Sequence, residues 1–135
     1  MPLNNAQTIL KLIEEVDPSD TYKLNEIDAR VWCWLRCDTY HSSGGTVVRV
    51  SYLNKFDEVH TFIKYTRSRD ALKAIRPQGW EYQTYQKGKE WFAELETEDV
   101  SCHVFLLTEE LAELHTILQA IEWERTKNAT IHTTN

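Results

Sequence analysis

The stretch YTRSRDALKAIRPQGWEY, residues 65–82, predicts a short helix that leads directly into a β-strand. The hydroxyl of Thr66 or Ser68 can cap this helix, because a side-chain oxygen at that position accepts a backbone N–H of the first turn. One face of the helix would then carry the apolar residues Ala71, Leu72 and Ile75. The helix must end before Pro77, since the residue before a proline avoids helical geometry, and Gly79 permits the tight turn that follows. We therefore interpret the stretch as a joint between a helix and a strand rather than as a catalytic signature.

Two helices are expected ahead of this joint. Apolar residues recur at near-helical spacing over 3–16 and over 22–36, and Ser19 or Asp20 can cap the second helix. Residues 38–45 include two Ser and two Gly, a composition that is typical of a loop.

Four or five strands are expected, two before the joint and two or three after it. The runs at 46–53 and 58–65 are rich in β-branched and aromatic residues and predict a hairpin. Runs at 79–86, 90–98 and 100–107 follow the joint and predict a second meander.

A long helix is expected to close the chain. Thr108 can cap it, and an apolar stripe runs through Leu111, Leu114, Ile117, Leu118 and Ile121. Residues 126–135 lack any period and are expected to form a flexible tail. The sequence thus predicts an α+β fold, a single domain over residues 1–135 in which an antiparallel sheet packs against helices.

Charge is distributed unevenly along the chain. The net charge is −6, and the segment from Glu90 to Glu124 holds ten acidic residues and no Lys or Arg. Such a segment opposes a phosphate backbone, so direct nucleic-acid binding is not expected there, whereas a basic protein surface would suit it. A solvated acidic face that keeps the protein dispersed is the simpler alternative.

No cofactor or metal site is predicted. Cys33 and Cys37 share a helix face, and together with Cys102 and His103 they are residue types that bind zinc. Cys102 and His103 are adjacent in an expected strand, however, and a strand points adjacent side chains to opposite faces. The three cysteines are expected to be reduced thiols. The mid-helix carboxylate of Asp28 is interpreted as a structural partner for the Tyr65–Thr66 loop rather than as a catalytic group.

The chain is also expected to lie outside membranes and outside the secretory route. No apolar run approaches the ~20 residues that a membrane span needs, and the first sixteen residues lack a basic region followed by an apolar one.

Three blocks carry a resemblance to a known family: NEIDARVWCWL at 25–35, the joint at 65–82, and LTEELAELHTILQAI at 107–121. In this order they resemble the phage ABA sandwich domain family of small phage and prophage proteins, over roughly residues 20–125. The matching positions are Glu26, Ile27, Asp28, Tyr65, Thr66, Ser68, Asp70, Ala71, Pro77, Gly79 and Trp80. The resemblance implies an α/β sandwich in a bacterial cytoplasm and no catalytic residues. Glu109 replaces the usual proline, and the 41–64 segment looks long and individual.

The hypothesis for function combines this resemblance with the acidic segment. It is a non-enzymatic phage or prophage accessory protein that binds a bacterial host protein through an acidic and aromatic face. Its most concrete form is an anti-CRISPR-type inhibitor, which would cover the nucleic-acid-binding surface of a host defence complex. The candidate contact residues are Trp91, Glu94, Glu96, Glu98, Asp99, Glu109, Glu110, Glu113 and Trp123.

Alternatives from other classes remain open. One is a module that binds a small signalling nucleotide, with a basic set of Arg49, Arg67, Arg69 and Arg76. Another is a small enzyme that uses a cysteine or a histidine, and a third is a purely structural domain. A homodimer joined through an aromatic patch is compatible with each of them.

Overall fold

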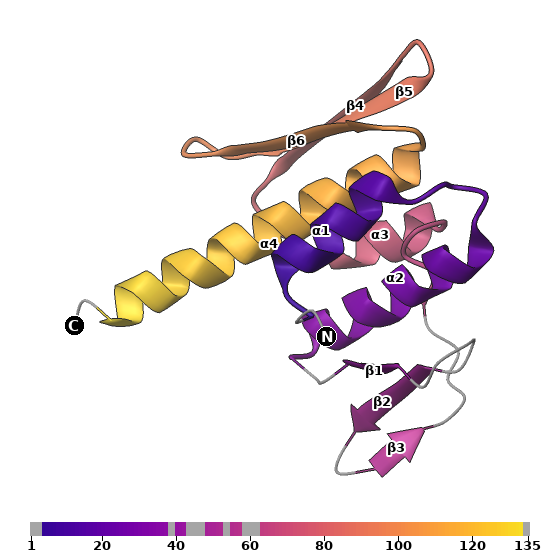
Figure 1. Cartoon of the computed structure of the whole chain (residues 1–135). Helices are drawn as coiled ribbons and strands as arrows, with labels where there is room; N and C mark the ends of the chain where they lie inside the picture. Colours follow the sequence, from indigo (N-terminus) through magenta and orange to yellow (C-terminus); the bar gives the residue numbers. More distant parts are fainter. Residues whose placement is uncertain (1–3, 38–39, 43–47, 53–54, 58–62, 134–135) are drawn as a thin grey trace. The chain divides into compact units, whose positions relative to one another are not determined.

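The computed structural model describes residues 4–37, 40–42, 48–52, 55–57 and 63–133 (Figure 1). Its backbone contacts divide the chain into two compact units, residues 1–71 and 72–135. Unit 1 contains two helices and a small sheet, and unit 2 contains a larger sheet and the C-terminal helix. A short helix, α3, lies across the boundary between them.

Two helices with side-chain caps form most of unit 1. Helix α1, Ala6–Glu15, is capped by Asn5, whose Oδ1 accepts the Thr8 N–H at 2.9 Å. Helix α2, Thr21–Leu35, is capped by Asp20, which accepts the Lys23 N–H at 3.1 Å. The two helices pack on each other, and their apolar faces are buried. The buried aliphatic side chains here include Ile9, Ile13, Leu24, Ile27 and Val31.

The sheet of unit 1 differs in part from the predicted hairpin. Strands β1 Tyr40–Ser42, β2 Val48–Tyr52 and β3 Lys55–Asp57 pair antiparallel in that order. The return strand therefore falls where the sequence suggested a turn, and Tyr65, expected in a strand, begins a turn. Because Tyr52 pairs with Lys55, the return strand starts within the predicted turn. Residues 58–62 of the predicted run lie outside the described residues. Strand β1 likewise lies in a predicted loop, since pairing with β2 overrides a weak local preference.

The joint at 65–82 has the structure that its sequence predicts. Helix α3, Arg69–Ile75, is capped by Ser68, whose Oγ accepts the Ala71 N–H at 3.2 Å. Pro77 follows the helix, and Gly79 has a φ of 86°, a backbone conformation that glycine adopts without strain. The next strand then begins at Glu81.

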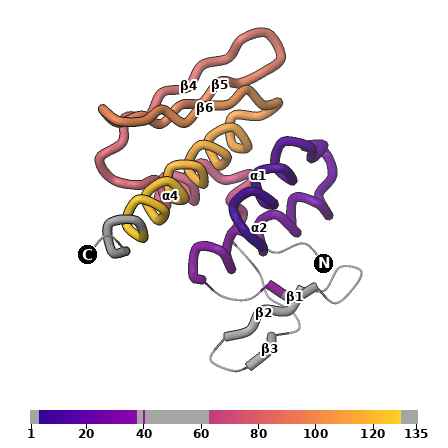
Figure 2. Tube along the Cα trace, turned by 60° about the vertical axis from the view of Figure 1, so that its left-hand side comes forward, coloured from indigo at the N-terminus to yellow at the C-terminus, as the bar shows by residue number. Residues whose placement is uncertain are grey.

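Unit 2 is an antiparallel sheet packed on a long helix. Strands β4 Glu81–Lys87, β5 Glu90–Glu96 and β6 Ser101–Leu106 are hydrogen-bonded in sequence order. All three strands contact α4, Glu109–Thr133, and Figures 1 and 2 show the sheet as a layer along one side of this helix. The predicted α+β class, with an antiparallel sheet against a long C-terminal helix, is confirmed. The extent of the domain, predicted as residues 1–135, stays a prediction.

Helix α4 begins as expected and ends later than expected. Thr108 caps it by accepting the Leu111 N–H at 3.1 Å. The helix continues through Thr133, so residues 126–133, predicted as part of an aperiodic tail, are helical. The physical reason is that adding a turn to an existing helix costs little, and no glycine or proline interrupts this one. Among the helices in the described ranges, none is long and apolar enough to cross a membrane.

Candidate functional site

The sheet of unit 2 has two chemically different faces. Successive side chains of a strand point to opposite faces, and pairing places Tyr82, Leu95 and Cys102 in one row. The Tyr82 hydroxyl donates to Glu113 of α4 at 3.2 Å, so this row faces the helix. Neighbouring rows on the other face point away from α4, and we call that side the outer face.

Three aromatic side chains form a continuous row across the outer face. The register places Tyr85, Phe92 and Phe105 directly opposite one another on β4, β5 and β6. Ring centroids are 4.8 Å apart for Tyr85–Phe92 and 4.9 Å apart for Phe92–Phe105. Phe92 is only 9% exposed, whereas Tyr85 is 48% and Phe105 40% exposed. We call these three residues the aromatic row.

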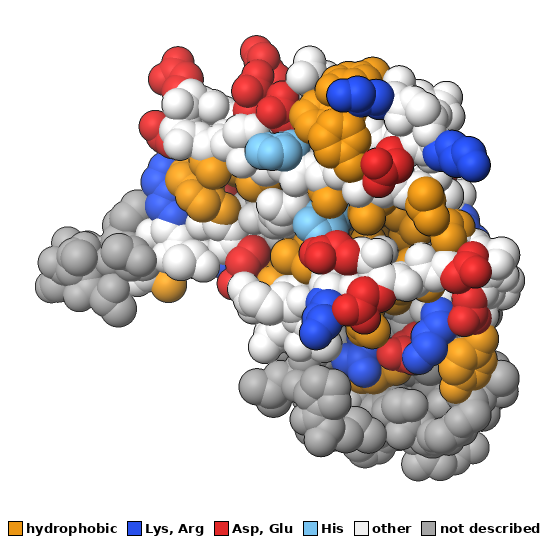
Figure 3. Space-filling view, turned by 45° about the horizontal axis from the view of Figure 1, so that its top comes forward, with side chains coloured by type: hydrophobic (Ala, Val, Ile, Leu, Met, Phe, Trp, Pro, Cys, Tyr) orange, Lys and Arg blue, Asp and Glu red, His pale blue; other side chains and the backbone are white. Residues whose placement is uncertain are grey.

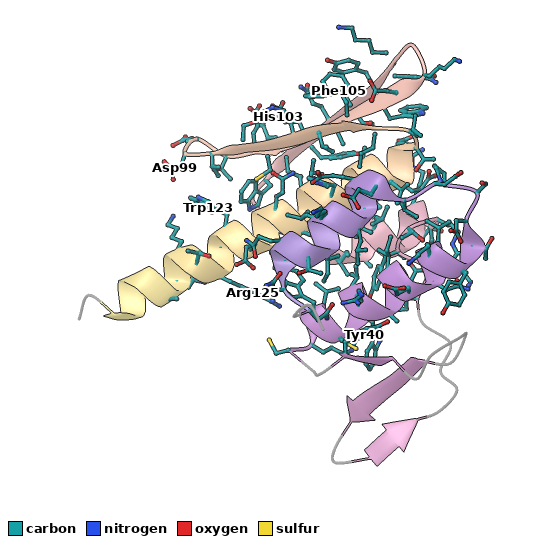
Figure 4. All side chains as sticks on the ribbon, in the orientation of Figure 1. Tyr40, Asp99, His103, Phe105, Trp123 and Arg125 are labelled. Atoms are coloured by element: carbon teal, nitrogen blue, oxygen red, sulfur yellow. The ribbon has the colours of Figure 1, made fainter. Side chains whose placement is uncertain are left out.

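Further apolar and ring surface continues beside the aromatic row. The His103 ring lies 6.0 Å from the Phe92 ring, and Figure 4 shows His103 and Phe105 on the side of the sheet away from α4. Leu107, which follows β6, is 57% exposed. Single exposed apolar groups are ordinary on a protein surface, whereas a contiguous set of exposed rings is a feature that contact surfaces share.

Carboxylates occupy the next rows of the same face. Glu94 accepts hydrogen bonds from Gln83 Nε2 at 2.8 Å and from Ser101 Oγ at 2.7 Å. Glu81 and Glu96 are direct cross-strand partners, and both are exposed. Like charges opposite each other destabilise a strand pair, so a cation bound there would relieve the repulsion. Figure 3 shows hydrophobic side chains gathered beside a histidine on this side of the molecule, with acidic side chains near them.

The structure distributes the predicted contact residues over several places. Glu94 and Glu96 lie on the outer face, Glu98 and Asp99 are exposed in the β5–β6 turn, and Glu109 begins α4. Glu110 lies beside Glu109 in the first turn of the helix, where a carboxylate interacts favourably with the helix dipole.

Trp91 lies on the face opposite to the one that the contact hypothesis requires. It shares strand parity with Ala93 and Leu95, which are both fully buried, so it faces α4 and is half-buried. Its neighbour Phe92 takes the outer position instead. Trp91 is therefore corrected from a surface anchor to a residue at the margin of the core.

Glu113 is also misplaced by the contact hypothesis, because it is only 1% exposed. Its Oε2 lies 2.6 Å from Arg76 Nη2, and its Oε1 accepts from the Tyr82 hydroxyl. The Arg76 guanidinium also stacks 4.1 Å from the centre of the Tyr82 ring. Burial, with a further contribution from the Glu113 charge, raises the pKa of Tyr82 to about 12. This carboxylate is a buried structural partner and not a surface acid.

Trp123 belongs to a recess of unit 2 that we call the indole pocket, with a volume of about 320 Å³. The Trp80 and Trp123 rings meet edge to face, 5.8 Å apart and at 87°. The Trp80 indole N–H donates to Glu124, and the Lys127 ammonium lies 4.8 Å from the centre of the Trp123 ring. Asp99 also lines the pocket, and Figure 4 shows it at the tip of the neighbouring turn. Asp99 and Glu124 therefore lie in the same recess as Trp123, but Glu124 bonds the Trp80 ring rather than the Trp123 ring.

Asp28 has the structural role that its position predicts. Its Oδ1 accepts the Thr66 N–H at 2.9 Å, and its Oδ2 lies 2.7 Å from Arg67 Nη2. The carboxyl is 2% exposed, and burial raises its pKa although the hydrogen bonds from Thr66 and Arg67 oppose that shift. The pair ties the turn before α3 to helix α2 within unit 1.

Two of the arginines suggested for nucleotide binding already have carboxylate partners. Arg67 pairs with Asp28 and also donates to Asn25 at 2.6 Å, while Arg76 pairs with Glu113. The side chain of Arg49 lies outside the described part of the chain. A phosphate group would have to compete with these internal ion pairs, which weakens the nucleotide alternative.

The cysteines do not assemble into a ligand set in the described ranges. Cys33 and Cys102 are buried, and burial raises the pKa of the Cys102 thiol. Cys37 is exposed and has a φ of 56°. Among the residues that the structure describes, no group of three or more His, Cys, Asp and Glu side chains is arranged to hold a metal ion.

Sequence reasoning missed Tyr85, Phe105 and His103 as surface residues. The signal that could have found them is strand parity: Ala93 and Leu95 are the natural core positions of β5, which leaves Phe92 and its cross-strand partners on the other side. Parity becomes informative only after the register of all three strands is known.

Comparison with other proteins leaves the chain without an assigned family. No protein-family model matches it, and searches of curated proteins and of solved structures give no significant match. The resemblance to the phage ABA sandwich domain family stays a prediction.

Proposed function

We propose that this protein is a non-enzymatic binding module whose outer sheet face docks a basic segment of another protein. The observation that carries the proposal is the exposed aromatic row with carboxylates in the adjoining rows of one face. A few residues, often aromatic, carry most of the binding energy in protein interfaces, and complementary charge selects the partner and speeds its approach.

The aromatic row is suited to act as the anchor. Tyr85 and Phe105 flank Phe92, so the three rings hold one another in place and lose little side-chain entropy on binding. Glu81, Glu94 and Glu96 lie on this face to one side of the aromatic row, and the exposed pair Lys87 and Glu90 forms the row on its other side. A partner that brings Lys or Arg to these carboxylates and an apolar side chain to the rings would complement both.

The most specific form of the proposal concerns the partner. A phage or prophage protein with such a face would act in the bacterial cytoplasm, where it would cover the basic surface of a host nucleic-acid-binding defence protein, as an anti-CRISPR inhibitor does. This part rests on the sequence resemblance and on the acidic charge alone. Occupation of that surface by protein would exclude the nucleic acid by charge and by volume.

The experiment is a comparison of variants in affinity capture. The tagged protein should retain one stoichiometric bacterial protein, and the retained amount should fall as salt rises. The double variant Tyr85→Ser/Phe105→Ser should weaken binding of that purified partner by at least about thirtyfold, the usual cost of losing interface anchors. Glu94→Lys should weaken it by about tenfold.

Glu15→Lys is the matched control, because it makes the same charge change at an exposed position of α1 in unit 1. It should leave the affinity unchanged. Equal binding by the wild type and the double variant, with both folded, would refute the proposal. So would a concentration-dependent homodimer that Tyr85→Ser/Phe105→Ser abolishes, because the face would then bind a second copy of the chain.

A further inference from the structure

The indole pocket has a composition that the docking proposal does not use. Its walls combine two indoles, Trp80 and Trp123, with the carboxylates of Asp99 and Glu124. A volume of about 320 Å³ is at the lower end of the roughly 300–1,000 Å³ that is typical of small-molecule pockets. It can therefore take a small ligand or a single side chain, but not a larger cofactor.

The pocket already contains an internal cation. The Lys127 ammonium lies 4.8 Å from the centre of the Trp123 ring, a distance typical of a cation–π interaction. In the described part of the chain, this ammonium makes no ion pair with a carboxylate. The ring of Trp123 is thus a group that this ammonium contacts, and the same ring would attract an ammonium from outside.

The carboxylates favour a cation over an anion or a neutral ligand. Glu124 accepts the indole N–H of Trp80, which fixes the orientation of that ring in the wall. Asp99 is exposed at the rim and can attract a charge as it approaches. The lining includes two carboxylates and one ammonium, so its formal charge is negative even with Lys127 in place.

We infer that the indole pocket binds an alkylammonium group, and that the side chain of Lys127 acts as an internal occupant which the ligand displaces. Lys127 is exposed near the end of a long helix and its four-carbon stem can swing into solvent. Displacement then exchanges one cation on Trp123 for another, and the carboxylates remain to hold the one that arrives.

The first test uses choline as the probe and dimethylbutanol, its uncharged carbon isostere, as the control. The chain has five tryptophans, and their indole N–H resonances can be followed separately by NMR. Titration with choline should shift the Trp80 and Trp123 resonances and leave Trp32, Trp34 and Trp91 in place. Equal shifts with dimethylbutanol, or shifts confined to the other three indoles, would overturn the inference.

Lys127→Gln tests the displacement. Removing the internal cation should tighten choline binding by about two- to fivefold, the equilibrium equivalent of an exposed cation–π contact. Lys89→Gln, which removes an exposed lysine from the β4–β5 turn, is the matched control and should change nothing. Asp99→Asn, at an exposed position that does not threaten folding, should weaken binding by about twofold. Unchanged affinity in both Lys127→Gln and Asp99→Asn would show that the pocket does not select a cation in this way.

A peptide that carries trimethyllysine distinguishes two sources of the same group. Tighter binding of the peptide than of choline would support the site and identify a protein side chain as its ligand. Equal or tighter binding of choline would support the site and identify a free amine. If neither probe shifts the Trp80 and Trp123 resonances, the inference is refuted. These outcomes concern the indole pocket and do not depend on the outer face.

Discussion

In each unit, the described residues include a buried helix carboxylate that pairs with an arginine. The two pairs have different structural roles. Asp28 of α2 lies 2.7 Å from Arg67, and Glu113 of α4 lies 2.6 Å from Arg76. Asp28 also accepts a backbone N–H, from Thr66, so it holds the path of the chain. Glu113 instead accepts from the Tyr82 hydroxyl and so joins side chains of the helix and the sheet.

This difference determines which substitution each carboxylate position tolerates. A backbone N–H needs only an acceptor of the right shape, which an amide oxygen can provide. A guanidinium stacked on the half-buried phenol of Tyr82 needs a negative charge, because an unpaired arginine is costly to keep away from water. We therefore expect Asp28 to tolerate a neutral isostere and Glu113 to tolerate truncation poorly.

The largest effect is expected for Glu113→Ala. It removes the partner of both Arg76 and the Tyr82 hydroxyl, and we expect the free energy of unfolding to fall by about 3 kcal/mol, the lower end of the range for a broken buried pair. The lower end applies because the Arg76 side chain is 26% exposed and can partly reach water. Urea unfolding followed by circular dichroism measures the change.

Glu122→Ala is the control for that variant, since it removes a half-exposed carboxylate from the same helix. It should change the free energy of unfolding by less than about 0.5 kcal/mol. Similar losses in the two variants would mean that the Glu113 pair contributes no more than surface charge.

A smaller effect, with a defined pH dependence, is expected for Asp28→Asn. The amide oxygen can still accept the Thr66 N–H, so we expect a loss of about 1 kcal/mol at neutral pH from the weakened contact with Arg67. Burial raises the folded-state pKa of Asp28 above its ordinary value of 3.8. The folded state therefore holds the proton more tightly, and this contribution to stability is present below pH 3.8 and is lost as the pH rises through the raised pKa.

The direction of the Asp28 pKa shift can be checked by measuring the unfolding of wild type and of Asp28→Asn at a series of pH values. Wild type should gain stability relative to Asp28→Asn as the pH is lowered towards 3.8. An opposite slope would show that attraction to Arg67 outweighs burial and lowers the pKa of Asp28.

The same contrast explains which parts of the molecule its sequence could reveal. The caps formed by Asp20, Ser68 and Thr108 depend on partners three residues away, so local pattern was sufficient. Glu113 pairs with a residue 37 positions distant and lies next to the apolar stripe, where a carboxylate looks solvated. No local signal distinguishes it from Glu110.

The outer face was hidden for a related reason. Whether Trp91 or Phe92 faces solvent depends on which side of β5 meets α4, and Ala93 and Leu95 decide that only through tertiary packing. Strand β3, which lies in a predicted turn, was missed for the same reason. Its position depends on the pairing of Tyr52 with Lys55 and not on local propensity.

Tyr82→Phe should cost less than loss of Glu113, because it removes only the hydroxyl that donates to that carboxylate. We expect about 1 kcal/mol at neutral pH, the usual net value of one hydrogen bond. The pKa of Tyr82 is raised from 10.0 to about 12, so its stabilising contribution is present below pH 10 and is lost as the pH rises to about 12.

Wild type should therefore lose stability relative to Tyr82→Phe over that alkaline range. Absorbance of tyrosinate gives an independent check, because one tyrosine that titrates near 12 should be missing from the variant. If all tyrosines of the wild type titrate near 10, burial of the hydroxyl is not as described.

Effects as small as that of Tyr82→Phe are expected for the two caps, and these variants test whether the units unfold together. Asn5→Ala removes the cap of α1 in unit 1, and Thr108→Ala removes the cap of α4 in unit 2. Each should lower the free energy of unfolding by about 1 kcal/mol.

Because the sequence predicts a single domain, we expect each variant to shift one common unfolding transition. Tryptophan fluorescence and circular dichroism should report the same transition. If Asn5→Ala instead moved only an early transition while Thr108→Ala moved only a later one, the two units would be separate folding domains. The carboxylates of Asp28 and Glu113 would then each stabilise a domain of their own.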